Sequence, residues 1–264
     1  QADAGLYHWP VWLNDPRYKL LGNTRMSEHI SRAYDSELDR LRRSLAEMGG
    51  MSERMLGDAT VALVRRDTTL AQRIITADQR LDNLQREVED RAVLTIAKRQ
   101  PVANDLRELI SAIRIASDIE RVGDLAKNIA KRAVAISGQF SPPPRAVVGL
   151  EHMSRLVQAQ LKDVLDAYAT GNEQKALEVW HRDGEIDALY TSLFRELLTY
   201  MMEDPRNITF CTHLLFCAKN IERIGDHTTN IAETIHYLVT GESLDINRPK
   251  LDTTDINVEA VTGS

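Results

Sequence analysis

Two segments of the chain carry the same acidic pattern, Glu120-Arg-Val-Gly-Asp124 and Glu222-Arg-Ile-Gly-Asp226. In an α-helix, which turns about 100° per residue, the Glu, the Asp and the Asn four residues beyond it share one stripe of the surface. Oxygen ligands of this kind suit hard cations such as Mg²⁺ or Mn²⁺, and iron also uses them. Each segment is therefore a candidate cation site.

The alternative is a plain solvated helix face. The chain contains 39 Asp and Glu among its 264 residues, so carboxylates four residues apart are expected by chance. Arg121 and Arg223 each precede the Asp by three residues, a spacing that allows a local ion pair. A solvated face needs no glycine, however, and Gly123 and Gly225 lie beside the acids, where each lowers helix stability. A small residue there lets a neighbouring helix or a ligand approach, so the spacing alone leaves both interpretations open.

The two motifs belong to an internal repeat. Residues 118–131 read DIERVGDLAKNIAK and residues 220–233 read NIERIGDHTTNIAE, which agree at eight of fourteen positions. A second acidic pair precedes each motif: Asp78 with Asp82 in the first half, and Asp183 with Asp187 in the second. Each half is predicted to pair an acidic motif on its second helix with one on its third.

Composition and hydrophobic periodicity predict an all-α protein. Hydrophobic residues make up 43% of the chain and aromatic residues only 5%, a balance that suits packed helices better than a sheet. The formal net charge of −6 argues against a nucleic-acid binder, which needs clustered Lys and Arg. No run of eighteen apolar residues is present, so no membrane span is expected.

Apolar residues at steps of three and four predict six long helices joined by short turns, hence two similar three-helix bundles. The pair Gly49-Gly50 interrupts the first helix, which indicates close packing against a neighbour or a kink. Asp67 is expected to cap the second helix, and Pro101 to stand in the first turn of the third. In the second half a turn is expected at Gly171-Asn172, followed by one helix that reaches Met202.

The predicted organisation has five parts. Residues 1–26 form a leader that is disordered or non-native, and residues 241–264 form a flexible tail. The first bundle spans 27–137, a Pro-rich linker spans 138–146, and the second bundle spans 147–240.

Each third helix has a core stripe that helical geometry places opposite its acidic stripe. The acids are therefore predicted to face away from the core of their own bundle. The predicted core positions are Ile119, Val122, Ala126, Ile129 and Ala133, and then Ile221, Ile224, Ile231 and Ile235.

Signs of catalysis are few. No Gly-rich phosphate loop, nucleophile elbow or His-Glu-x-x-His motif occurs, so no enzyme is predicted. The alternative is a ferritin-like di-metal carboxylate bundle, which needs a Glu-x-x-His on each of two helices. One such spacing exists, Glu233 to His236, but Lys131 and Val134 stand at the equivalent positions of the other half. His227 is expected to be a surface or interhelical histidine rather than a ligand.

Several further motifs, in order along the chain, resemble those of the PhoU family of phosphate-signalling regulators. The resemblance covers residues 36–238. Besides the two acidic motifs, it rests on Met48-Gly-Gly-Met51, Arg99-Gln-Pro-Val-Ala-Asn-Asp-Leu-Arg107, Glu203-Asp-Pro-Arg-Asn-Ile208 and Asn230-Ile-Ala-Glu233.

The resemblance implies two three-helix bundles, often dimeric, without established enzymatic activity. It implies a cytoplasmic negative regulator of the phosphate-starvation response that links the ATPase subunit of a phosphate ABC transporter to a sensor histidine kinase. Metal ions, namely Mg, Mn, Fe or Zn, are expected on the acidic motifs. The implied ligands are Asp78, Asp82, Glu120, Asp124, Asn128, Asp183, Asp187, Glu222, Asp226 and Asn230. The halves differ where Leu125-Ala-Lys127 faces His227-Thr-Thr229, which predicts two sites of unequal affinity.

Overall fold

The computed structural model describes residues 16–138 and 144–244, with side chains for 34–138 and 146–244. Most of the predicted leader, much of the predicted linker and nearly all of the predicted tail lie outside these ranges. The chain divides into two compact units at Leu41, and the second unit contains every candidate site residue.

The all-α prediction is confirmed, since the described residues form helices and contain no strand. None of the described helices is long and apolar enough to cross a membrane. The first half contributes α1 (Pro16–Arg65), α2 (Thr68–Arg99) and α3 (Asn104–Ile136). The second half contributes α4 (Pro144–Thr170), α5 (Glu173–His181), α6 (Asp183–Glu203), the short 3₁₀ helix η2 (Pro205–Asn207) and α7 (Ile208–Thr240).

The helix caps follow the expected chemistry. The Asp67 carboxylate accepts the Leu70 backbone N–H at 2.9 Å and starts α2. The Asn172 side chain accepts the Lys175 N–H at 3.0 Å and starts α5. Gly241 ends α7 with φ of 83°, a left-handed conformation that favours glycine.

Two boundaries differ from the prediction. The third helix starts at Asn104, so Pro101 lies in the connection rather than in its first turn. The single helix expected from Asn172 to Met202 is broken at Arg182 into α5 and α6. The break is stabilised from α4, because Gln160 Nε2 donates to the Arg182 carbonyl at 3.2 Å and the Arg182 guanidinium bonds Asp163 at 2.8 Å. These tertiary contacts compensate for the lost helical hydrogen bonds.

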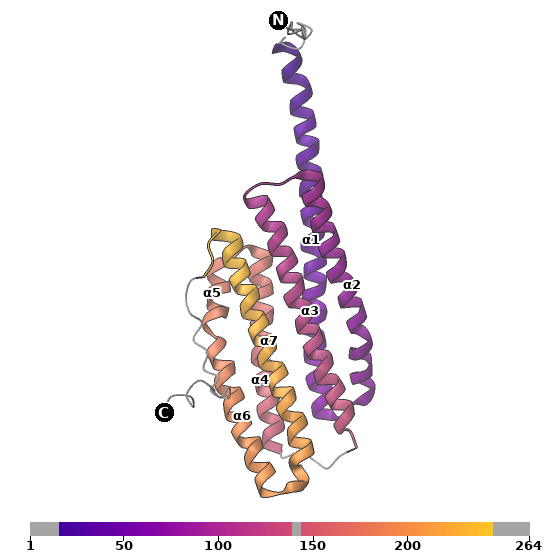
Figure 1. Cartoon of the computed structure of the whole chain (residues 1–264), viewed down its shortest axis with the longest axis vertical. Helices are drawn as coiled ribbons and strands as arrows, with labels where there is room; N and C mark the ends of the chain where they lie inside the picture. The colour runs from indigo at the N-terminus through magenta and orange to yellow at the C-terminus, as the bar shows by residue number, and fades with distance from the viewer. Residues whose placement is uncertain (1–15, 139–143, 245–264) are drawn as a thin grey trace, which may run out of the picture. The chain divides into compact units, whose positions relative to one another are not determined.

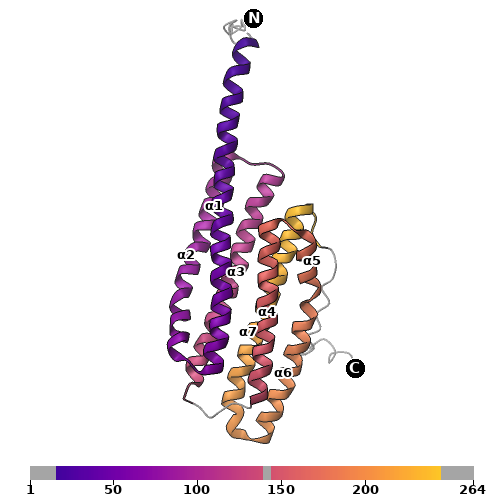
Figure 2. The same ribbon diagram turned by 180° about the vertical axis from the view of Figure 1, so that it is seen from behind.

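The repeat is visible in how the two halves of the second unit pack. The equivalent helices α3 and α7 lie side by side in both views (Figures 1 and 2). The part of α1 beyond Leu41 packs on α4, where the Thr60 and Ser154 hydroxyls lie 2.6 Å apart. A Cβ on Gly49 would lie 2.8 Å from Leu165 Cδ1, so the close-packing interpretation of the glycine pair is confirmed at Gly49.

The core stripes are confirmed in full. All nine predicted positions on α3 and α7 are buried with no exposed surface.

The two mid-helix glycines of the acidic motifs are not equivalent. A Cβ on Gly123 would lie 2.2 Å from Leu81 Cδ2, whereas one on Gly225 would meet Ile186 Cγ2 at an ordinary 3.6 Å. We expect Gly123→Ala to destabilise the fold by about 2 kcal/mol, because Leu81 is fully buried and must shift. Gly225→Ala should instead stabilise it by about 1 kcal/mol through helix propensity.

Urea unfolding of the two single variants measures this difference. Equal effects at the two positions would contradict the packing at Leu81.

Candidate functional site: two acidic clusters

The first acidic cluster comprises Asp78 and Asp82 of α2 with Glu120 and Asp124 of α3. The two helices pack along their length and bring the pairs together. Lys127 of α3 lies between them: its Nζ is 2.5 Å from both Asp78 Oδ2 and Asp124 Oδ1. A lysine ammonium thus occupies the position in this cluster where a bound cation would neutralise the carboxylates.

The titration of the first cluster reflects this pairing. Burial raises the pKa of Asp78 against the opposing effect of the Lys127 hydrogen bond. Burial also raises the pKa of Glu120, and the nearby Asp124 carboxylate adds to the effect. Although burial by itself would lower the pKa of Lys127, its hydrogen bonds to Asp124 and Asp78 raise it. Lys127 therefore stays charged over the whole working pH range.

The second acidic cluster comprises Asp183 and Asp187 of α6 with Glu222 and Asp226 of α7. Thr229 stands at the position equivalent to Lys127, and its hydroxyl donates to Asp183 Oδ1 at 3.1 Å. A hydroxyl carries no charge, so this cluster lacks the central lysine of the first.

Glu222 is the most perturbed member of the second cluster. It is 5% exposed, and its Oε2 is buried without a hydrogen-bond partner. Its Oε1 accepts from Lys219 Nζ at 3.0 Å, from the partly exposed edge of the cluster. Burial is the main cause that raises the pKa of Glu222 to about 7, and the Asp226 and Asp187 carboxylates contribute. A buried acceptor with no donor is energetically unfavourable and is suited to a cation.

The acids were predicted to face away from the core of their own bundle, but Glu222 is itself buried. The acidic stripe does lie opposite the core stripe, but α2 in the first half and α6 in the second pack alongside it. In a three-helix bundle a helix has two neighbours, so one stripe cannot describe all of its buried surface.

The two asparagines of the motif have surroundings different from those of the carboxylates. Asn230 donates to Asp118 of α3 at 3.5 Å, and Asn128 lines a pocket between α3 and α7. Among the residues with described side chains, no three His, Cys, Asp or Glu groups stand close enough together to hold a metal ion. Cation binding at either cluster would thus require the carboxylate side chains to rotate toward one another.

The residues of the ferritin-like alternative have separate partners. Glu233 accepts from Trp180 Nε1 at 3.0 Å, and His236 Nδ1 lies 3.0 Å from Glu173. His227 bridges the two halves, with its Nδ1 2.9 Å from Asp118, as expected of an interhelical histidine.

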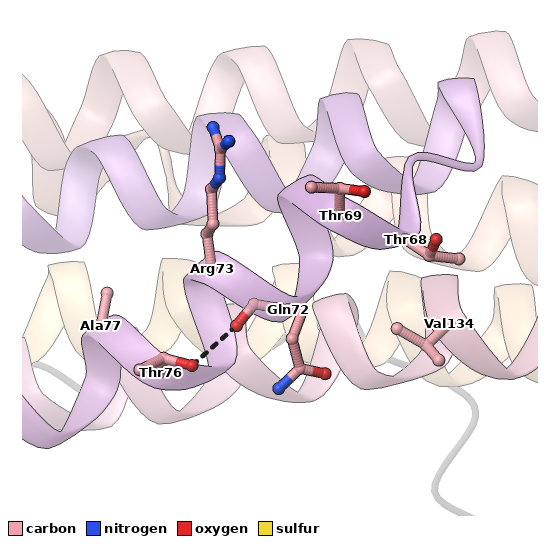
Figure 3. Close-up of a pocket in the computed structure, with 7 residues that line it drawn as sticks. All are labelled: Thr68, Thr69, Gln72, Arg73, Thr76, Ala77 and Val134. Atoms are coloured by element: carbon pink, nitrogen blue, oxygen red, sulfur yellow. Dashed lines mark hydrogen bonds between the residues drawn. The ribbon is translucent and has the colours of Figure 1, made fainter.

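Another surface pocket lies away from the acidic clusters. It has a volume of about 800 Å³ and is formed by the first turns of α2, from Thr68 to Ala77, together with Val134 of α3 (Figure 3). Its polar lining is mainly threonine, and Thr76 donates to the Gln72 carbonyl at 3.0 Å. None of the predicted ligands lines it.

Sequence reasoning did not identify the role of Lys127 as an internal counter-ion. A signal was present, because Lys127 and Thr229 stand at equivalent repeat positions and differ in charge. The distance between Lys127 and Asp78, which are 49 residues apart in the chain, required the fold.

The fold and the duplicated clusters define a class of protein: tandem helical bundles built from one repeated acidic unit. A family model described as the PhoU domain matches residues 45–133 and again residues 150–235. The chain belongs to the PhoU family.

The similarity of this chain to relatives and to solved structures extends over both repeats. A "phosphate-specific transport system accessory protein PhoU homolog" from Rhizobium meliloti is 58% identical over 86% of this chain and 95% of its own length. A homolog of the same name from Caulobacter vibrioides is 52% identical over 86% of this chain and 98% of its own. The crystal structure of PhoU from Pseudomonas aeruginosa superimposes with a TM-score of 0.76 at 38% identity, over 79% of this chain and all of that one. The phosphate transport system regulatory protein PhoU from Streptococcus pneumoniae gives a TM-score of 0.74 at 30% identity, over 81% of this chain and all of that one.

Proposed function

We propose that this protein is a regulatory accessory protein of phosphate-specific transport that represses the phosphate-starvation response when phosphate is plentiful. The observation that carries the proposal is the 58% identity to a relative of that name across both repeats. The protein acts by binding rather than by catalysis. Its partners are the ATPase subunit of the phosphate ABC transporter and a sensor histidine kinase, which implies a location at the cytoplasmic side of those complexes and a homodimeric state.

Deletion of the gene in phosphate-rich medium tests this role. Transcripts of phosphate-starvation genes should rise, and a plasmid copy of the intact gene should restore repression. Unchanged transcript levels in the deletion strain would refute the regulatory role. Co-purification with the transporter ATPase and with the kinase, done separately, tests the two partners.

The acidic clusters are proposed to bind divalent or iron-type cations, with the second cluster as the stronger site. Support comes from Glu222, whose buried Oε2 has no hydrogen-bond partner, and from Thr229, which stands where the first cluster has the lysine that bridges two carboxylates. Asp183, Asp187, Glu222 and Asp226 would hold the ion, and it would neutralise their mutual repulsion. In the first cluster Lys127 already supplies that charge.

Metal content separates the two clusters. Protein purified without chelator should lose most of its Mg, Mn, Fe or Zn in a Glu222→Gln variant, because the ion loses its buried ligand. A Glu120→Gln variant should keep it, since Lys127 excludes a second cation from the first cluster. Elemental analysis of the two variants measures this, and equal loss in both would refute the unequal sites.

A further inference from the structure

A second pocket lies between the equivalent helices α3 and α7. Its volume is about 430 Å³. Its polar and aromatic lining comes from both halves of the repeat: Asn128, Lys131, Arg132, His213, Phe216 and Asn220. No carboxylate contributes to this lining, although the chain as a whole carries a net charge of −6.

Two donors of this α3–α7 pocket, Arg132 and His213, are held in place by contacts with other lining residues. The Cζ atom of the Arg132 guanidinium lies over the Phe216 ring, 4.2 Å from its centroid. Its Nη1 lies 3.3 Å from His213 Nδ1. Because a guanidinium can only donate, Nδ1 accepts and the imidazole proton sits on Nε2, which is then a donor. Burial, with a contribution from Arg132, lowers the pKa of His213 and keeps this neutral form at neutral pH.

The cations of the pocket are not neutralised by protein carboxylates. Within the part of the chain that the structure describes, neither Lys131 nor Arg132 forms an ion pair with an Asp or Glu. A pocket with several N–H donors, two cations and no internal counter-ion has the chemistry of an oxyanion site.

The repeat provides an internal comparison. Asn220 and Lys131 of the pocket are equivalent to Asp118 and Glu233 at the other end of the α3–α7 interface. There Asp118 pairs with His227 at 2.9 Å and Glu233 accepts from Trp180 at 3.0 Å. One end of the duplicated interface therefore keeps two bonded carboxylates, whereas the other end has an amide and an ammonium at the same positions.

We propose that the α3–α7 pocket binds a phosphate group, either as the free anion or as part of a small phosphomonoester. Arg132 and Lys131 supply charge, the His213 Nε2–H and the amides of Asn128 and Asn220 supply further hydrogen bonds, and Phe216 forms an apolar wall. The volume exceeds that of the bare anion and leaves room for the carbon part of an ester.

Calorimetric titration of the full chain with inorganic phosphate, AMP and adenosine tests the proposal. The buffer contains a chelator and no phosphate. A heat of binding for inorganic phosphate identifies the free anion as a ligand. A heat of binding for AMP but not for phosphate identifies an ester as the ligand, and either result supports the site. No binding of either compound, or equal binding of adenosine, would overturn it.

The equivalent positions of the repeat suggest substitutions that should weaken phosphate binding. The double variant Lys131→Glu/Asn220→Asp introduces the residues found at the equivalent positions and should weaken binding at least tenfold, about 1.4 kcal/mol. A control of equal charge change, Lys98→Glu/Gln72→Glu on the exposed face of α2, should bind as the parent does. Asn220→Asp alone, nearly unchanged in volume, should show a partial loss and serves if the double variant does not fold. Unaltered affinity in Asn220→Asp and in a folded double variant would overturn the assignment.

Discussion

Replacement of Lys127 by threonine should destabilise the fold by about 3 kcal/mol at pH 7 in the presence of a chelator. The substitution introduces the residue of the equivalent position, Thr229, and leaves Asp78 without its cation. Asp78 has 8% of its side-chain surface exposed, and its Oδ1 already lacks a hydrogen-bond partner. Removal of one member of such a pair leaves an uncompensated buried charge, which is the main source of the loss.

Urea unfolding of three variants measures this effect. Asp78→Asn in the Lys127→Thr background should recover part of the stability, because the uncompensated charge at position 78 is then removed. Added Mn²⁺ or Mg²⁺ should stabilise Lys127→Thr more than the parent, because an external cation can then enter the first cluster. A Lys127→Thr protein as stable as the parent, or one indifferent to Asp78→Asn, would show that the ammonium is not a structural counter-ion.

Stability should fall as the pH rises from about 4.5 to about 7, and Glu222 should account for much of that slope. In the folded protein Glu222 titrates near 7, against about 4.5 in the unfolded chain. Between these values the folded state binds the extra proton, so raising the pH favours unfolding. Below the lower value both states are protonated and the penalty is absent.

Glu222→Gln removes the ionisable group and should stabilise the metal-free protein at pH 8 by up to about 3 kcal/mol, with little effect at pH 4. The loss of the Lys219 hydrogen bond reduces this gain somewhat. Chemical unfolding at a series of pH values, with a chelator present, gives the slope of the unfolding free energy against pH. Glu185→Gln, a change at an exposed carboxyl of the same helix pair, is the control and should leave the slope intact. A Glu222→Gln protein with the same slope as the parent would mean that Glu222 is not held protonated.

Both predictions arise from an asymmetry between two copies of one unit. Lys127 and Thr229 occupy one repeat position, yet the first closes its cluster with a charge and the second with a hydroxyl. The same pattern recurs at the α3–α7 interface, where Lys131 and Glu233 are equivalent. Duplication has preserved the helices and altered which carboxylates the protein itself neutralises.

The sequence by itself determined the helices, the repeat and the core stripes of α3 and α7, because 3.6-residue periodicity and capping act over short distances. It also identified the eight carboxylates of the two acidic clusters and the repeat positions, such as Lys127 and Thr229, at which the two halves carry different residues. The break at Arg182 could not be predicted, since Gln160 and Asp163 of α4, about twenty residues away, stabilise it.

Only the tertiary structure decided what surrounds each carboxylate. The burial of Glu222, the position of Lys127 between Asp78 and Asp124, and the direction of Asn128 and Asn230 toward the α3–α7 interface all depend on neighbouring helices. Periodicity gives the angle of a residue on its own helix but not the helices that pack beside it. Burial and pairing, which set charge and affinity, are therefore properties of the assembled bundles.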